Sequence, residues 1–151
     1  MESSDIKIDK DGIWYYQGAH MFRKDILRVF FEHLKVDDSG KYFVELNEEI
    51  YYLDVEDTAF VVTSVCKTKT PINCHERIDV LLSDECLEKL DLSSLFVGKN
   101  NIMYCRIKDG KFTARFTRSS YYQMAEFIEM DDATDCFYID LNNERYFIKN
   151  N

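Results

Sequence analysis

The sequence predicts an α+β protein made of two repeated β-β-α-β-β units, each a helix packed on a small antiparallel sheet, with an unrepeated middle segment. The stretch 42–53 returns as 137–148, with Leu, Asn, Glu and Tyr identical at a spacing of 95 residues. Asp11-Gly12 returns as Asp109-Gly110 at a spacing of 98, and each pair precedes an aromatic-rich stretch and an amphipathic segment. A shared order at nearly constant spacing indicates a duplicated structural unit.

Each unit is expected to begin with a β-hairpin. In the first unit, strands at 6–8 and 13–16 flank Asp11-Gly12, a pair that tolerates the positive φ angles of a tight turn. In the second unit, strands at 102–107 and 111–117 flank the other Asp-Gly pair. The later of these strands alternates apolar and polar residues, with the period of two that is typical of a half-buried strand.

A helix is predicted after each hairpin. In the first unit, apolar residues recur at helical spacing over residues 22–34 and leave charged residues for solvent. In the second unit, Ser119 or Ser120 can cap a helix whose apolar face lies within 121–128. A helix laid on one face of a small antiparallel sheet is a stable layer arrangement.

Each unit should close with a second hairpin, which bends at Asn47-Glu48 in the first unit and at Asn142-Asn143 in the second. The middle of the chain has no counterpart of this kind. We therefore expect residues 1–66 to form the first helix-on-sheet unit, 67–101 a connecting strand and loop segment, and 102–151 the second unit. Since no Gly/Ser linker separates them, the sequence favours one compact body.

Composition limits the classes of partner. A net charge of −9 and a pI near 4.8 repel nucleic-acid phosphates and anionic membranes, so neither is an expected partner. The start of the chain lacks the basic residues of a signal peptide, and no apolar run approaches the ~18 residues of a membrane helix. A cytoplasmic protein is therefore predicted.

The five cysteines are odd in number and lack Cys-x-x-Cys spacing, which predicts reduced thiols. Cys66, Cys74 and His75 are the candidate zinc ligands, but their spacing matches no familiar zinc motif. Gly is scarce, at five residues, and no phosphate-cradling loop is present. We therefore predict no metal and no other cofactor.

Two ordered sets of residues carry a family resemblance. One runs from Asp11-Gly12-Ile13-Trp14-Tyr15 through Gly18, Arg23, Phe30, Gly40, Tyr42 and Glu49 to Val55-Glu56-Asp57 and Phe60. The other is Ala114-Arg115-Phe116-Thr117-Arg118 followed by Tyr121-Tyr122-Gln123-Met124. Together they resemble the bacterial domain-of-unknown-function family 1285. This resemblance implies repeated helix-on-sheet motifs and suggests a part in signalling or ligand sensing. Asn47 and Ala59 stand where the family usually has proline.

Arg115 and Arg118 belong to the only basic concentration in this acidic chain, and Glu56 and Asp57 are the natural opposite charges. They can form an ion-pair network that joins the two units. Alternatively, the arginines can bind an anion or an acidic partner, because a guanidinium suits carboxylate and phosphate. In either case we expect at least one arginine to pair with Glu56 or Asp57. The candidate ligand-binding residues are Arg115, Arg118, Tyr122, Glu56, Asp57 and Arg23.

The sequence favours a non-enzymatic binding or regulatory module, with a role in signal transduction, that holds a small acidic ligand or a protein partner between its units. No catalytic residues are predicted, because no Ser or Cys has a nucleophile-elbow context and the repeated carboxylates are explained by repeated turns. One alternative is a small enzyme that uses the Arg pair with Glu56 or Asp57. Another is a homodimeric interaction scaffold.

Overall fold

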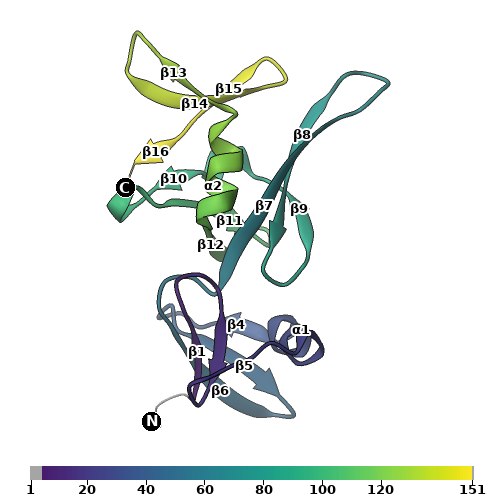
Figure 1. Cartoon of the computed structure of the whole chain (residues 1–151), viewed down its shortest axis with the longest axis vertical. Coiled ribbons are helices and arrows are strands. Elements are labelled where there is room, and N and C mark those ends of the chain that lie inside the picture. Colours follow the sequence, from purple (N-terminus) through teal and green to yellow (C-terminus); the bar gives the residue numbers. More distant parts are fainter. Residues whose placement is uncertain (1–4, 151) are drawn as a thin grey trace. The chain divides into compact units, whose positions relative to one another are not determined.

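The structure is a computed structural model that describes residues 5–150. The chain divides into two compact units, Met1–Ala59 and Phe60–Asn151. The division falls immediately before the long strand β7 (Phe60–Lys69), whereas the sequence suggested a boundary after residue 66. Each unit is described below by itself (Figure 1).

The N-terminal unit is a six-stranded sheet with one helix. Its elements are β1 (Ile6–Ile8), β2 (Trp14–Tyr16), β3 (Ala19–His20), α1 (Lys24–Glu32), β4 (Leu34–Val36), β5 (Tyr42–Leu46) and β6 (Glu49–Val55). The strand order is β3-β2-β1-β6-β5-β4. The first strand runs parallel to the last, with Ile6 opposite Leu53, and the other neighbours are antiparallel.

One face of this sheet forms the core of the unit. Because side chains alternate along each strand, β1 buries Ile6 and Ile8, while Lys7 between them is exposed. Trp14 is 2% exposed, and its ring packs against Phe30 and Phe31 of α1 at centroid distances of 5.9 and 5.0 Å. No residue of α1 is itself buried, so the helix covers the core incompletely.

The C-terminal unit contains two sheets and one α-helix. Its strands are β7, β8 (Glu76–Leu82), β9 (Leu87–Lys89), β10 (Phe96–Val97), β11 (Met103–Ile107), β12 (Phe112–Phe116), β13 (Ile128–Asp131), β14 (Cys136–Leu141), β15 (Glu144–Phe147) and β16 (Lys149–Asn150). Its helices are α2 (Arg118–Ala125) and the 3₁₀ turns η1 (Leu92–Ser94) and η2 (Lys99–Asn101). One sheet has the order β16-β10-β11-β12-β7-β8-β9, and the other is β13-β14-β15.

Helix α2 packs on β7. Thr117 caps the helix by accepting a hydrogen bond from the Ser120 N–H, and Met124 is fully buried. Ser120 Oγ donates to the Val62 carbonyl at 2.8 Å, and Gln123 Oε1 accepts from the Val65 N–H at 2.7 Å. These polar contacts anchor the helix to main-chain groups of the strand beneath it.

A half-buried ion pair joins two turns of the seven-stranded sheet. Lys108 follows β11, and its Nζ lies 2.7 Å from the Asp84 carboxylate, which lies between β8 and β9. The same ammonium lies 5.5 Å from the centre of the Phe60 ring. Farther along the β7–β8 hairpin, the loop 70–75 projects from the unit (Figure 1), and its Ile72 is 98% exposed.

The predicted fold class is wrong. Residues 5–150 hold sixteen strands in three sheets and only two α-helices, so the protein is mainly β rather than a repeat of helix-on-sheet units. In the N-terminal unit both hairpins join one sheet through the β1–β6 pair. In the C-terminal unit β10 takes the place beside β11, and the last hairpin lies in a separate sheet.

The two last hairpins themselves are alike. Val44 lies opposite Tyr51, and Ile139 lies opposite Tyr146, in the same register relative to the turn. The repeated sequence therefore encodes a repeated hairpin. The hairpins differ in the sheets that they join: the first extends to β1 through β6, whereas the last belongs to the separate three-stranded sheet with β13.

Candidate functional site

The candidate site is a cavity of about 570 Å³ in the N-terminal unit, bordered by α1 and by the core face of the sheet. The sheet contributes Ile6, Val44 and Leu46, and the helix contributes Ile26 and Phe30. Met21 and Phe22 belong to the loop that leads into the helix. The polar lining side chains are Tyr16, His20, Arg23, Asn47 and Tyr51.

Local sequence explains why this space stays open. Gln17 and Gly18 adopt φ angles of 49° and 82°, which turn the chain back from β2 to β3. The Met21 N–H then donates to the Trp14 carbonyl at 2.9 Å and holds the loop on the sheet. The Trp14 indole supports the C-terminal half of α1, because it contacts Phe30 and Phe31. The first half of the helix instead borders the cavity through Ile26.

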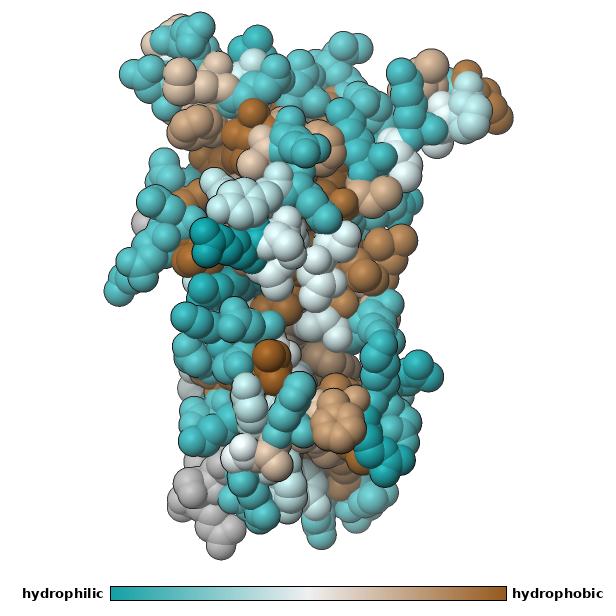
Figure 2. Space-filling view, in the orientation of Figure 1, coloured by the Kyte–Doolittle hydropathy of each residue, from teal (hydrophilic) through white to brown (hydrophobic). Residues whose placement is uncertain are grey.

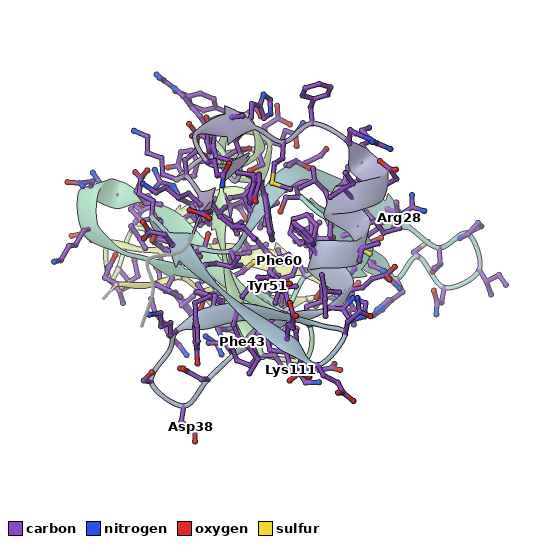
Figure 3. All side chains as sticks on the ribbon, turned by 90° about the horizontal axis from the view of Figure 1, so that it is seen from below. Arg28, Asp38, Phe43, Tyr51, Phe60 and Lys111 are labelled. Carbon is purple, nitrogen blue, oxygen red and sulfur yellow. The ribbon has the colours of Figure 1, made fainter. Side chains whose placement is uncertain are left out.

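Apolar side chains at the cavity are consequently accessible. Phe22 is 75% exposed and Ile26 is 38% exposed. Tyr51 of β6 lies on the side of the sheet that faces α1, and Phe43 of β5 lies on the other side (Figure 3). On the face shown in Figure 2, hydrophobic residues occur as separate patches among hydrophilic ones. The cavity itself is a mainly apolar recess.

The polar groups of the cavity differ in how they are held. The Tyr51 hydroxyl donates to the Glu49 carboxylate, and this hydrogen bond raises the pKa of Tyr51. The His20 ring lies near the Tyr15 and Phe22 rings, at 5.9 and 6.1 Å between centroids. Arg23 pairs at 2.8 Å with Asp25, and that hydrogen bond lowers the pKa of Asp25. Both partners of this ion pair are 66% exposed.

The lining of the cavity is mainly apolar and carries a few polar groups. The side chains around the cavity include no carboxylate, serine or cysteine, so it offers no nucleophile beside a general base. Within residues 5–150, no group of three His, Cys, Asp or Glu side chains is placed to hold a metal ion. Large apolar walls with a few polar groups are typical of ligand sites.

Of the predicted site residues, only Arg23 lies at this cavity. Arg115 is a half-buried residue of β12. Arg118 opens α2 and is exposed; its Nε donates to the Tyr122 hydroxyl at 3.4 Å, which raises the pKa of Arg118. Glu56 and Asp57 follow β6. Pairing between these arginines and carboxylates would link the two units, and it stays a prediction.

Sequence reasoning missed most of the cavity. It assigned Ile26 and Phe30 to a buried helix stripe and Asn47 to a turn, and it gave His20 no role. The predicted stripe began at Phe22, but the helix spans only Lys24–Glu32, so Phe22 lies in the preceding loop and lines the cavity. No pattern in the sequence marked this difference.

The cysteines are free thiols. Cys66, Cys74, Cys86 and Cys136 are exposed, whereas Cys105 is fully buried, and burial raises its pKa to about 12. We expect a thiol-specific chromogenic disulfide to titrate four groups in the native protein at about pH 8 and all five in denaturant, since the thiolate is the reactive form. Burial also raises the pKa of Cys86, which should be the slowest of the four. Fewer than five groups in denaturant would contradict free thiols.

Neither α-helix within residues 5–150 has both the length and the apolar character that a membrane span requires.

Comparison with known proteins relates this chain to one family. Residues 1–58 match the model described as the N-terminal domain of a domain of unknown function, DUF1285. A search of curated proteins finds no match. Two solved structures, both of DUF1285 family proteins, share the fold. The protein from Silicibacter pomeroyi DSS-3 is 19% identical with a TM-score of 0.76, and the alignment covers 97% of this chain and 79% of that one.

The DUF1285 family protein from Shewanella baltica OS155 is also 19% identical, with a TM-score of 0.66, and the alignment covers 83% of this chain and 94% of that one. At this identity the two likenesses establish the fold alone. The family model covers almost all of the unit that encloses the cavity. The resemblance found in the sequence is therefore confirmed, and the unit that holds the cavity is similar to the DUF1285 N-terminal domain, a domain of unknown function.

Proposed function

We propose that this chain is a non-enzymatic binding module whose N-terminal cavity takes a ligand with an apolar body and an acidic group. The observation that carries the proposal is the cavity of about 570 Å³, whose walls are mainly apolar and whose lining includes Arg23. This volume lies within the range of about 300–1,000 Å³ that is usual for ligand sites.

Arg23 is suited to receive the acidic group. Its ion pair with Asp25 is exposed on both sides, and pairs of this kind contribute only about 0–1 kcal/mol. A ligand carboxylate can therefore replace Asp25 at little cost, and the planar guanidinium can bind it with two hydrogen bonds. His20 adds a second polar group at the same cavity.

Other parts of the proposal rest on the sequence. A regulatory role in signalling and a cytoplasmic location are part of the proposal; free thiols support the second of these, because cytoplasmic thiols stay reduced. A homodimeric interaction scaffold stays an alternative. The acidic charge argues against nucleic acid as the ligand. The enzyme alternative finds little support at the cavity, because the lining has no carboxylate, serine or cysteine beside His20.

We expect the chain to bind 8-anilinonaphthalene-1-sulfonate, an apolar anionic fluorophore, and Ile26→Glu to weaken this binding by about tenfold or more. The new carboxylate would stand in the apolar wall and repel the sulfonate. Val29→Glu is the matched control: it lies on the same helix with similar exposure, 42% against 38%, and does not line the cavity. Fluorescence titration of the natively folded variants, checked by near-ultraviolet circular dichroism, measures the effect.

Arg23→Gln separates charge recognition from apolar contact. It should weaken the sulfonate about threefold to tenfold and leave the neutral analogue N-phenyl-1-naphthylamine unaffected, because only the anion uses the guanidinium. Equal binding of the sulfonate to the native chain, the Ile26→Glu variant and the Val29→Glu variant would place the ligand elsewhere. That result would end the proposal for this cavity.

A further inference from the structure

A side-chain amide in the C-terminal unit pairs with the main chain of a neighbouring strand. Asn142 lies in the turn between β14 and β15, and its Oδ1 accepts from the Glu76 N–H at 2.7 Å. Its Nδ2 donates to the Glu76 carbonyl at 2.9 Å. A residue in an antiparallel strand uses its own N–H and C=O to make this same pair of bonds with the residue opposite. The turn thus presents a group that recognises extended backbone.

The N-terminal unit has the same turn. Asn47 and Glu48 adopt φ angles of 51° and 68°, and Asn142 and Asn143 adopt 53° and 65°. The closing pairs are also alike: Leu46 lies opposite Glu49, as Leu141 lies opposite Glu144. Asn47 therefore presents its side chain from its hairpin in the way that Asn142 does from its own.

The two amides differ in what they meet. The Asn142 amide is occupied by Glu76, whereas the Asn47 side chain lines the cavity and makes no hydrogen bond with any residue from 5 to 150. An amide offers both a donor and an acceptor, and a ligand that uses both must present a complementary pair. The main chain of an extended peptide presents such a pair at every second residue along one edge.

We propose that the cavity binds an extended peptide segment of a partner protein, and that the Asn47 amide pairs with the N–H and C=O of one peptide residue. This inference rests on the proposed function and names its ligand. An apolar peptide side chain enters the recess beside Ile26 and Val44, as in other complexes that combine main-chain bonds with side-chain pockets. A neighbouring acidic residue pairs with Arg23.

Charge at the start of α1 favours an acidic segment. The chain carries −9 overall, yet residues 23–28 hold Arg23, Lys24 and Arg28 against the single carboxylate of Asp25. Arg28 projects outward from α1 (Figure 3) and makes no ion pair within the described part of the chain. A local basic surface beside the cavity speeds the approach of an oppositely charged peptide.

The test begins with random peptides of about twelve residues displayed on phage, a length that spans the recess and its flanks in an extended conformation. They are selected on the whole chain, with removal of those that also bind the Ile26→Glu variant. Fluorescein-labelled copies of the selected peptides are then titrated by fluorescence polarisation.

Asn47→Gly should weaken peptide binding about tenfold, the size expected of two lost hydrogen bonds. Asn142→Gly is the matched control and should leave binding within about twofold of the native chain. Glycine adopts positive φ freely, so both turns are retained.

The peptide supplies the other half of the test. Each backbone nitrogen of the peptide is methylated in turn. At one position, methylation should lower the affinity for the native chain about tenfold and should not lower the affinity for the Asn47→Gly variant. Unchanged binding by Asn47→Gly would overturn the role of the amide. If no peptide is selected while the sulfonate fluorophore still binds at the cavity, the peptide inference fails and the proposed function stands. If neither binds, both fail.

Discussion

Trp14→Ala is expected to destabilise the N-terminal unit by about 3–5 kcal/mol, enough to leave much of it unfolded under native conditions. Trp14 is 2% exposed, and its ring contacts Phe30 and Phe31 of α1. Truncation removes the surface on which the helix rests and leaves a cavity that the short strands around it cannot close. Urea unfolding followed by far-ultraviolet circular dichroism measures the loss.

Trp14→Phe is the discriminating control. The buried indole Nε1 has no hydrogen-bond partner within residues 5–150, and burying such a donor costs about 1–3 kcal/mol. Phenylalanine removes that unpaired donor while it keeps much of the apolar contact, so the net loss should be about 1 kcal/mol. If Trp14→Phe is as destabilising as Trp14→Ala, a phenyl ring does not retain the packing of the indole, and the expected net loss of about 1 kcal/mol is wrong.

Lys108→Met is expected to cost the C-terminal unit about 3 kcal/mol, because it leaves the Asp84 carboxylate without its partner. Asp84 is 9% exposed in its side chain, and Lys108 is 29% exposed. Methionine keeps most of the apolar stem of the lysine, so the loss reports the charge. Adding Asp84→Leu should recover much of the stability, since an apolar pair of similar volume can replace a buried ion pair.

The pH dependence of the same variant has a definite sign. Partial burial lowers the pKa of Lys108, but the hydrogen bond and charge of Asp84 raise it more, so the pKa lies above its ordinary value. A raised folded pKa means that the contribution is fully present below the unfolded value of about 10.4 and is lost as pH rises through the folded value. The gap in stability between the native chain and the variant should therefore close only above about pH 10.

The exposed pair between Lys35 and Glu45 serves as the control for this prediction. Its side chains are 55% and 43% exposed, and Lys35→Met should cost less than about 1 kcal/mol. A loss equal to that of Lys108→Met would show that removal of any lysine charge, rather than exposure of Asp84, determines the effect.

The hairpins could be predicted from the sequence because their determinants are local. Asp11-Gly12, Asn47-Glu48 and Asn142-Asn143 all mark observed turns, and all three contain residues at positive φ. The arrangement of the sheets could not be predicted in this way. Whether β1 pairs with β6, or β11 with β10, depends on partners far away in the sequence, and no periodicity in either strand encodes that choice.

Only one residue of the candidate site, Arg23, was predicted from the sequence, and it was chosen because it belongs to the residues that carry the family resemblance. The cavity itself is the space left between a short helix and a sheet, and no residue pattern specifies a volume. Asn47 was assigned to turn structure alone, which its φ angle supports. The Asn47 amide also lies at an apolar recess and has no hydrogen-bond partner in residues 5–150. The importance of this was recognised only by comparison with the Asn142 amide, which is hydrogen-bonded to Glu76.

The parallel pair of β1 and β6 affects how the N-terminal unit is made during synthesis. Ile6 finds its partner Leu53 only in the last strand of the unit, so the sheet cannot be completed until β6 has left the ribosome. Contacts this distant in sequence form late and slowly, because the chain between them must be ordered first. Until then Ile6 and Ile8 lack the strand that pairs with β1 in the folded unit, and a chain that stops before β6 would remain a target for chaperones and proteases.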